Sequence, residues 1–104
     1  MEFNLEKIKQ KISELENEMQ KHSVVSNKDK MAKLGREYNE AKEIFDLANT
    51  INKTQKDIAN LNESIAREED EEMIALTQEE ITALQNRLQA DQEKFEELLN
   101  PADP

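Results

Sequence analysis

One glycine and two prolines are the only strong breakers of regular structure in this 104-residue chain. Gly35 lies in the first half, and both prolines fall among the last four residues, at Pro101 and Pro104. Because Gly and Pro most often interrupt a helix, their absence from residues 36–100 permits very long helices. The chain also has no cysteine and a single histidine, His22, so most residue types that build catalytic and metal sites are nearly missing.

The composition favours long helices over a compact core. Hydrophobic residues make up 36% of the chain and charged residues 37%. Such a balance is typical of amphipathic helices that each bury one narrow apolar stripe. We therefore expect an all-α fold, namely a three-helix bundle dominated by a long, coiled-coil-like antiparallel helical hairpin.

Apolar residues in the first segment recur at alternating steps of three and four, at Leu5, Ile8, Ile12, Leu15 and Met19. This spacing places them on one helix face and predicts a helix near residues 4–23, with Asn4 as its N-cap. His22 would then interact with the negative end of the helix dipole. Val24 and Val25 are expected to pack down in a loop, and Asn27 or Ser26 to cap the next helix.

Two apolar stripes, offset by one residue, follow in the next segment and predict a single helix from Lys28 to Arg67. The offset indicates either a local change of supercoil or a helix that meets one neighbour early and another late. We expect Gly35 to mark a close helix approach or a mild bend, since glycine in a helix costs about 1 kcal/mol relative to alanine. The first stripe is Met31, Leu34, Tyr38, Ala41, Phe45 and Ala48, and the second is Ile44, Leu47, Ile51, Thr54, Ile58, Leu61 and Ile65.

An acidic run at residues 68–72 predicts a turn capped by Asp70, followed by a third helix over residues 71–99. Ile58 and Leu84 lie in the middle of their stripes and are expected in the core. Two polar residues, Thr77 and Asp91, occupy positions in phase with the third stripe. They argue against a strict dimeric coiled coil.

The net charge of −10 comes entirely from the last third of the chain. Residues 1–67 hold 12 acids and 12 bases, whereas residues 68–104 hold 12 acids and two bases. An acidic surface repels nucleic-acid backbones and anionic lipid, so we expect neither partner for this third. It is either a solvated face or a contact for a basic protein surface, with candidate contact residues Glu68, Glu69, Glu71, Glu72, Glu79 and Glu80.

No pattern of nucleophile, base, metal ligands or phosphate-binding glycines is present, so we expect a protein that is not an enzyme, with no cofactor and no metal site. No apolar run approaches the ~18 residues that span a bilayer. A cytoplasmic protein without membrane partners is the simplest interpretation. The oligomeric state is left open between a monomer and a weak dimer.

Three ordered stretches resemble the N-terminal helical domain of bacterial class I peptide chain release factors of the type-1 kind. Leu34-Gly35-Arg36-Glu37-Tyr38 is similar to a short segment of that family's long helix. Asp70 to Ala75, with Gln78 to Ile81, is similar to its hairpin turn and acidic helix. Leu98 to Pro104 is similar to the exit that leads into its codon-reading domain.

This resemblance implies a role in translation termination in the cytoplasm. It further implies contacts with the ribosome, at the stalk base of the large subunit, and with the class II release-factor GTPase. The family's Gly-Gly-Gln and Pro-x-Thr motifs cannot occur here, because the chain has one glycine and no proline before Pro101. Residues 1–100 are thus expected to form the helical domain, and residues 101–104 the start of a linker to an absent codon-recognition domain.

Two other classes of function stay open on the residues alone. One is a generic coiled-coil adaptor that homodimerises through its apolar stripes. The other is a helical-hairpin chaperone or regulator without a role on the ribosome.

Overall fold

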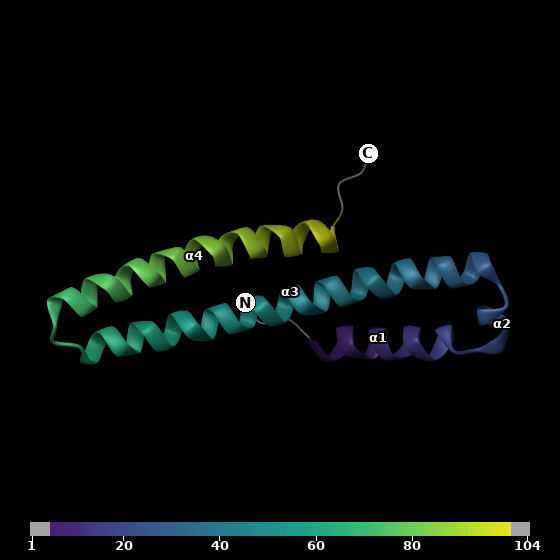
Figure 1. The fold of residues 1–104 in the computed structure, drawn as a ribbon, viewed down its shortest axis with the longest axis horizontal. Coiled ribbons are helices and arrows are strands. Elements are labelled where there is room, and N and C mark those ends of the chain that lie inside the picture. The colour runs from purple at the N-terminus through teal and green to yellow at the C-terminus, as the bar shows by residue number, and fades with distance from the viewer. Residues whose placement is uncertain (1–4, 101–104) are drawn as a thin grey trace. The chain divides into compact units, whose positions relative to one another are not determined.

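The computed structural model describes residues 5–100, and four helices without any strand account for nearly all of this range (Figure 1). The helices are α1 (Leu5–Met19), α2 (His22–Val25), α3 (Lys28–Arg67) and α4 (Glu71–Leu99). The predicted all-α fold is confirmed, and both long helices begin and end at the predicted residues. The predicted cap Asn4 and the segment 101–104 lie outside the described residues.

The first helix is shorter than predicted, and a separate short helix follows it. α1 ends at Met19, where the backbone amides of Gln20 and Lys21 donate to carbonyls only three residues back. The apolar stripe stops at Met19, so no buried side chain holds the helix beyond that point. His22 therefore begins α2 and does not end the first helix.

The two valines of α2 differ in burial, although both were expected to pack down. The side chain of Val24 is buried, whereas that of Val25 is 56% exposed. They also lie in a helical turn and not in a loop. Adjacent residues of a helix point about 100° apart, so a single turn can bury only one of them.

A side-chain cap fixes the start of α3. The backbone amide of Lys30 donates to Oδ1 of Asn27 at 3.2 Å, which satisfies one of the amides that a helix N-terminus leaves without a partner. Of the two predicted cap residues, Asn27 is therefore the one used.

The chain divides into two compact units, residues 1–48 and 49–104, and the boundary lies within α3. The first unit has a core of Ile12 and Leu15 from α1 with Ala41 from α3. Partly buried apolar side chains complete this core: Ile8, Leu34, Tyr38 and Phe45. The α3 members belong to the first of the two predicted stripes, which confirms that this stripe serves one neighbour.

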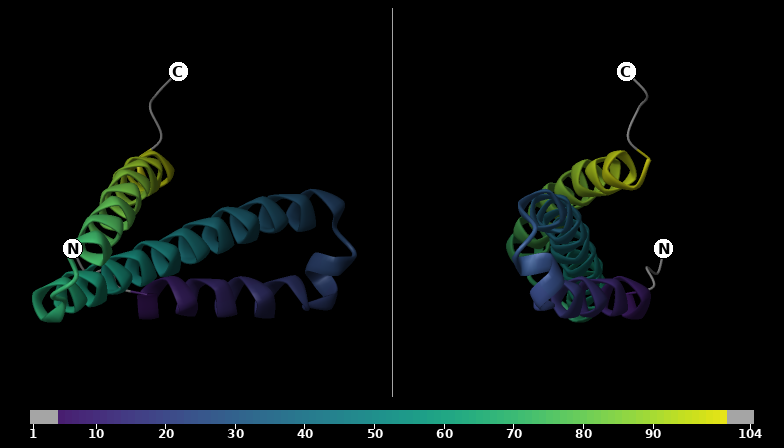
Figure 2. Two further views of the ribbon diagram at one scale, coloured as in Figure 1. Left: turned by 60° about the vertical axis from the view of Figure 1, so that its left-hand side comes forward. Right: turned by 90° about the vertical axis from the view of Figure 1, so that its right-hand side faces the viewer.

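The second unit is an antiparallel hairpin of the last part of α3 and α4 (Figures 1 and 2). Its most buried side chains are Ile51, which is fully buried, Ile81 and Phe95. Thr54 is buried too, and its hydroxyl donates to the carbonyl of Thr50 at 2.9 Å, so it leaves no unsatisfied polar group. Ile58 and Leu84, expected in the core, are only half-buried.

Asp91 interrupts the apolar stripe of α4 as predicted. Its side chain is half-buried, and its Oδ2 atom is buried without a hydrogen-bond partner among the described residues. A buried carboxylate oxygen without a partner costs free energy, so Asp91 weakens the packing of this face.

Gly35 marks no close approach of another helix. A Cβ atom built at this position meets nothing within 4 Å, and the backbone has no positive φ. The predicted close approach is therefore wrong, and glycine is not required here by any contact.

The Gly35→Ala substitution should stabilise the chain by about 1 kcal/mol, since alanine has the better helix propensity and there is room for its methyl group. Urea denaturation followed by circular dichroism would measure the change. A destabilised variant would contradict the open space seen at this position.

The Ile51→Ala substitution should destabilise the chain by about 3–4 kcal/mol, because the side chain is fully buried. The matched Ile58→Ala change should cost only about 1–2 kcal/mol, since Ile58 is half-buried. The same denaturation experiment compares the two. If Ile51→Ala does not fold, Ile51→Val should still cost about 1 kcal/mol. Equal costs at positions 51 and 58 would contradict the observed burial.

The Asp70→Ala substitution should cost about 1 kcal/mol, because Asp70 caps α4 with its side chain. Asp70→Asn keeps an oxygen acceptor and should lose much less stability. Glu69→Ala serves as the control, since Glu69 makes no such bond in the described turn. Thermal unfolding of the three variants would test the cap, and equal losses for Ala and Asn would assign the effect to charge alone.

Candidate functional site: an acidic tip on the helical hairpin

The turn between α3 and α4 is built by its own carboxylates. Oε1 of Glu68 accepts from the backbone amide of Asp70 at 3.1 Å, and Oδ1 of Asp70 accepts from the amide of Glu72 at 3.0 Å. The amide of Glu68 donates to the carbonyl of Ile65 at 3.1 Å and closes the last turn of α3. Two acids of the run thus hold the turn in shape, as the predicted cap requires.

Four glutamates surround this turn, and we call Glu68, Glu69, Glu71 and Glu72 the acidic tip. All four side chains are exposed, and none forms an ion pair with another of residues 5–100. Glu71 and Glu72 lie in the first turn of α4, where the positive end of the helix dipole favours negative charge. The tip therefore presents several carboxylates to solvent at little cost to the fold.

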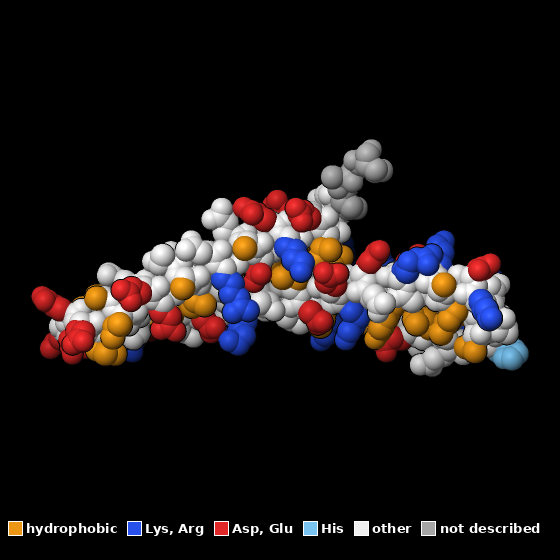
Figure 3. All heavy atoms as spheres, turned by 45° about the horizontal axis from the view of Figure 1, so that its top comes forward, with side chains coloured by type: hydrophobic (Ala, Val, Ile, Leu, Met, Phe, Trp, Pro, Cys, Tyr) orange, Lys and Arg blue, Asp and Glu red, His pale blue; other side chains and the backbone are white. Residues whose placement is uncertain are grey.

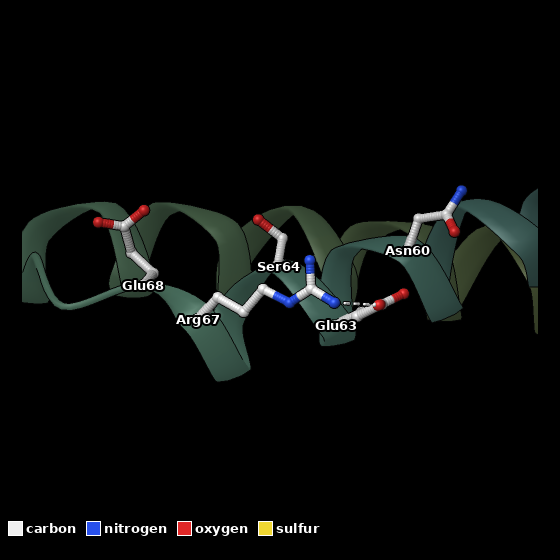
Figure 4. A pocket seen from close by; sticks show the side chains of 5 residues that line it. All are labelled: Asn60, Glu63, Ser64, Arg67 and Glu68. Atoms are coloured by element: carbon white, nitrogen blue, oxygen red, sulfur yellow. Dashed lines mark hydrogen bonds and ion pairs between the residues drawn. The ribbon is translucent and has the colours of Figure 1, made fainter.

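Arg67 is the basic residue nearest the tip in sequence, and its side chain points back along α3, away from the tip. Its Nη2 atom lies 2.8 Å from Oε1 of Glu63, one helical turn back. Figure 4 shows the guanidinium reaching toward Glu63, while the carboxylate of Glu68 lies apart from it. Arg67 consequently leaves the acidic tip uncompensated.

A surface hollow of about 360 Å³ lies beside the tip (Figure 4). Every residue that lines it is polar: Asn60, Glu63, Ser64, Arg67 and Glu68. Sites for small molecules are mostly apolar and enclosed, with a few placed polar groups. This hollow is therefore a poor small-molecule site, and the tip is better suited to a macromolecular surface.

Glu79 and Glu80 lie further along α4 and do not act as a pair. Both are exposed, but neighbouring residues on a helix point about 100° apart. At this rotation per residue, Glu79 shares its strip of α4 with Glu72, Glu93 and Glu97. The strip is the face opposite the apolar stripe, which is also where a solvated face is expected.

No group of three or more His, Asp or Glu side chains that could hold a metal ion occurs within residues 5–100. The described helices include none that combines the length and the apolar character needed to cross a bilayer.

A basic segment is not evident in the charge balance of residues 1–67, because acids elsewhere in that range cancel its positive charge. Residues 21–36 contain five bases and only one acid, Asp29. In the first unit, Lys21, Lys30 and Lys33 line a hollow of about 380 Å³ together with Val24 and Leu34. A charge count in shorter windows would have found this segment.

Comparison with known proteins identifies the family. Residues 8–104 match the PCRF domain. Peptide chain release factor 1 of Chlorobaculum tepidum is 32% identical over 99 residues, which is 95% of this chain and 28% of that protein. The factor of the same name from Lachnoclostridium phytofermentans is 32% identical over 100 residues, 96% of this chain and 28% of that protein.

A third relative, peptide chain release factor 1 of Oleidesulfovibrio alaskensis, is 27% identical over 100 residues, 96% of this chain and 28% of that protein. The chain thus spans little more than a quarter of the length of these curated relatives. No solved structure matches it significantly. The family model matches nearly the whole chain, and the relatives carry the same name. The chain therefore belongs to the PCRF domain family of class I peptide chain release factors.

Proposed function

We propose that this chain is the helical, non-catalytic domain of a peptide chain release factor and works in translation termination. The observation that carries the proposal is the PCRF match over residues 8–104, together with three relatives named peptide chain release factor 1. In this proposal residues 1–100 are the domain, and residues 101–104 begin the linker to a codon-recognition domain. The setting is the ribosome in the cytoplasm.

The proposed role is to dock the factor, and the chemistry of release belongs elsewhere. With a single glycine, the chain cannot contain the Gly-Gly-Gln motif that the family uses for hydrolysis. The residues that it does offer are long helices with charged faces, which suit binding and positioning. A catalytic residue, cofactor or metal is therefore not part of the proposal.

We assign the docking contact to the acidic tip, with the stalk base of the large subunit and the class II release-factor GTPase as its partners. Exposed carboxylates without ion-pair partners suit a basic protein surface, since complementary charges steer association. A turn between two long helices can also reach a partner that the remainder of the factor does not touch. The competing surface is the strip of α4 that carries Glu79, Glu93 and Glu97.

Charge reversal would distinguish these two surfaces. This chain would replace the matching segment of the Chlorobaculum tepidum factor, and Glu69, Glu71 and Glu72 would be changed to Lys, leaving Glu68 and Asp70, which hold the turn, unchanged. We expect slower stop-codon-dependent release and slower GTPase-dependent recycling on ribosomes. The difference in rate between this variant and the unchanged chimera should shrink as the salt concentration rises, because exposed charges more than ~10 Å apart are screened at moderate ionic strength.

The matched control reverses Glu79, Glu93 and Glu97 in the same chimera, with an identical change in net charge. Circular dichroism and thermal unfolding would confirm that both variants remain folded. If the control is impaired and the tip variant is not, the contact lies on the face of α4. If neither variant is impaired, the acidic tip is a solvated turn.

A further inference from the structure

A second strip of α4 lies beside the stripe that packs in the hairpin, and every residue on it is exposed. It contains two of the four large apolar side chains that are exposed within residues 5–100, Met73 and Leu76. Figure 3 shows hydrophobic side chains reaching the surface at intervals along the second unit, with charged side chains between them. We call this strip the α4 seam, and its members are Met73, Leu76, Glu80, Ala83, Arg87, Ala90 and Lys94.

The members of the α4 seam follow one another at alternating steps of three and four residues. This spacing repeats every seven residues over three heptads, and it is the pattern by which one helix pairs with another in a coiled coil. The second position of each repeat is apolar, at Leu76, Ala83 and Ala90. The hairpin itself packs through a different stripe, which contains the buried Ile81 and Phe95. The seam therefore stays open to a partner helix.

The charges of the seam select the orientation of a second copy of the chain. In a parallel pair each residue meets its own counterpart, so Glu80 would face Glu80 and Arg87 would face Arg87. Like charges placed opposite one another oppose association. In an antiparallel pair centred beside Ala83, Glu80 of each copy faces Arg87 of the other, and two ion pairs form. The seam is thus complementary in charge to itself in the antiparallel orientation alone.

The same antiparallel register gives the apolar members of the seam their partners. At equal distances from the centre, Leu76 lies beside Ala90 of the other copy. Met73 lies opposite Lys94, whose aliphatic stem can cover it. The small side chain of Ala83 falls at the centre, where it lets the two helix axes approach to about 8 Å.

The two charged residues that set this register are available for it. The side chains of Glu80 and Arg87 are exposed, and neither forms an ion pair with another of residues 5–100. Exposed ion pairs add little affinity, so these pairs chiefly fix the orientation, while the apolar contacts supply most of the attraction. A single helix pair with alanine at two of its contact positions is small for a specific interface, and such interfaces are weak.

We propose that the α4 seam binds a second copy of this chain in the antiparallel orientation and forms a weak homodimer. This proposal is independent of the proposed function, since it concerns another strip of α4. The antiparallel orientation also places the acidic tips of the two copies at opposite ends of the helix pair, where their like charges are far apart.

Sedimentation equilibrium of the full 104-residue chain near physiological salt, where repulsion between distant charges is screened, would test the proposal. We expect a dissociation constant on the order of 10⁻⁴ M. The Glu80→Arg variant should dimerise at least about tenfold more weakly, because two arginines then face one another at both contacts. This change lowers the net negative charge of the chain, so repulsion between whole chains would predict the opposite result.

The double variant Glu80→Arg, Arg87→Glu exchanges the two charges and keeps the net charge of the chain at −10. The two ion pairs of the antiparallel register are then restored with their signs reversed. Its dissociation constant should return to within about threefold of that of the unchanged chain, which is the coupling that a double-mutant cycle measures.

The matched control is Glu96→Arg, which makes the same change of charge at an exposed position of the same helix. Glu96 follows Arg87 by nine residues and therefore points away from the seam, at about 180°. This variant should dimerise within about twofold of the unchanged chain. Circular dichroism and thermal unfolding would confirm that all variants remain folded, since Glu and Arg are both good helix formers.

Three outcomes would overturn the proposal. The first is an unchanged chain that remains monomeric up to about 1 mM, a concentration about ten times the expected dissociation constant. The second is a double variant that dimerises no more tightly than Glu80→Arg. The third is an equal loss in Glu80→Arg and Glu96→Arg, which would assign dimerisation to another surface. Because no ribosome is present in these measurements, a failure of the acidic tip on ribosomes leaves them unaffected.

Discussion

The burial of apolar side chains along α3 is the interaction on which the other elements depend. α3 supplies Ala41 to the core of the first unit and the fully buried Ile51 to the second. α1 has only Ile12 and Leu15 buried, so its stability comes from docking on α3 and not from its own length. A chain with so few apolar residues can bury them only where helices run alongside one another, and α3 is long enough to serve two neighbours in turn.

The bounds of α3 and α4 could be predicted because local chemistry marks them. Asn27 and Asp70 cap the two helices with their side chains, and no glycine or proline interrupts either apolar pattern after residue 35. The end of α1 was predicted less accurately than the bounds of α3 and α4. Nothing after Met19 resembles a C-cap, and the helix ends there because the next in-phase residues are polar and bury nothing.

The candidate site was predictable in position and only partly in detail. The exposed acidic run was evident from the sequence, but the two carboxylates that hold the turn, those of Glu68 and Asp70, appear only once the backbone is known. The basic segment near α2 was hidden because its charge cancels that of distant acids in a long sum. The family was indicated by three short motifs, whereas general physical chemistry alone led no further than a helical docking module.

The uneven burial of α3 has a consequence for its internal motion. Its most buried residues, Ala41, Ala48, Ile51 and Thr54, lie in the middle, while nearly every residue in its first and last turns is exposed. Backbone amide hydrogens exchange with solvent most readily where the least apolar area must be uncovered to open a turn. The acidic tip adjoins the C-terminal end of α3, so a partner bound at the tip would slow exchange at that end while leaving the middle of the helix unchanged.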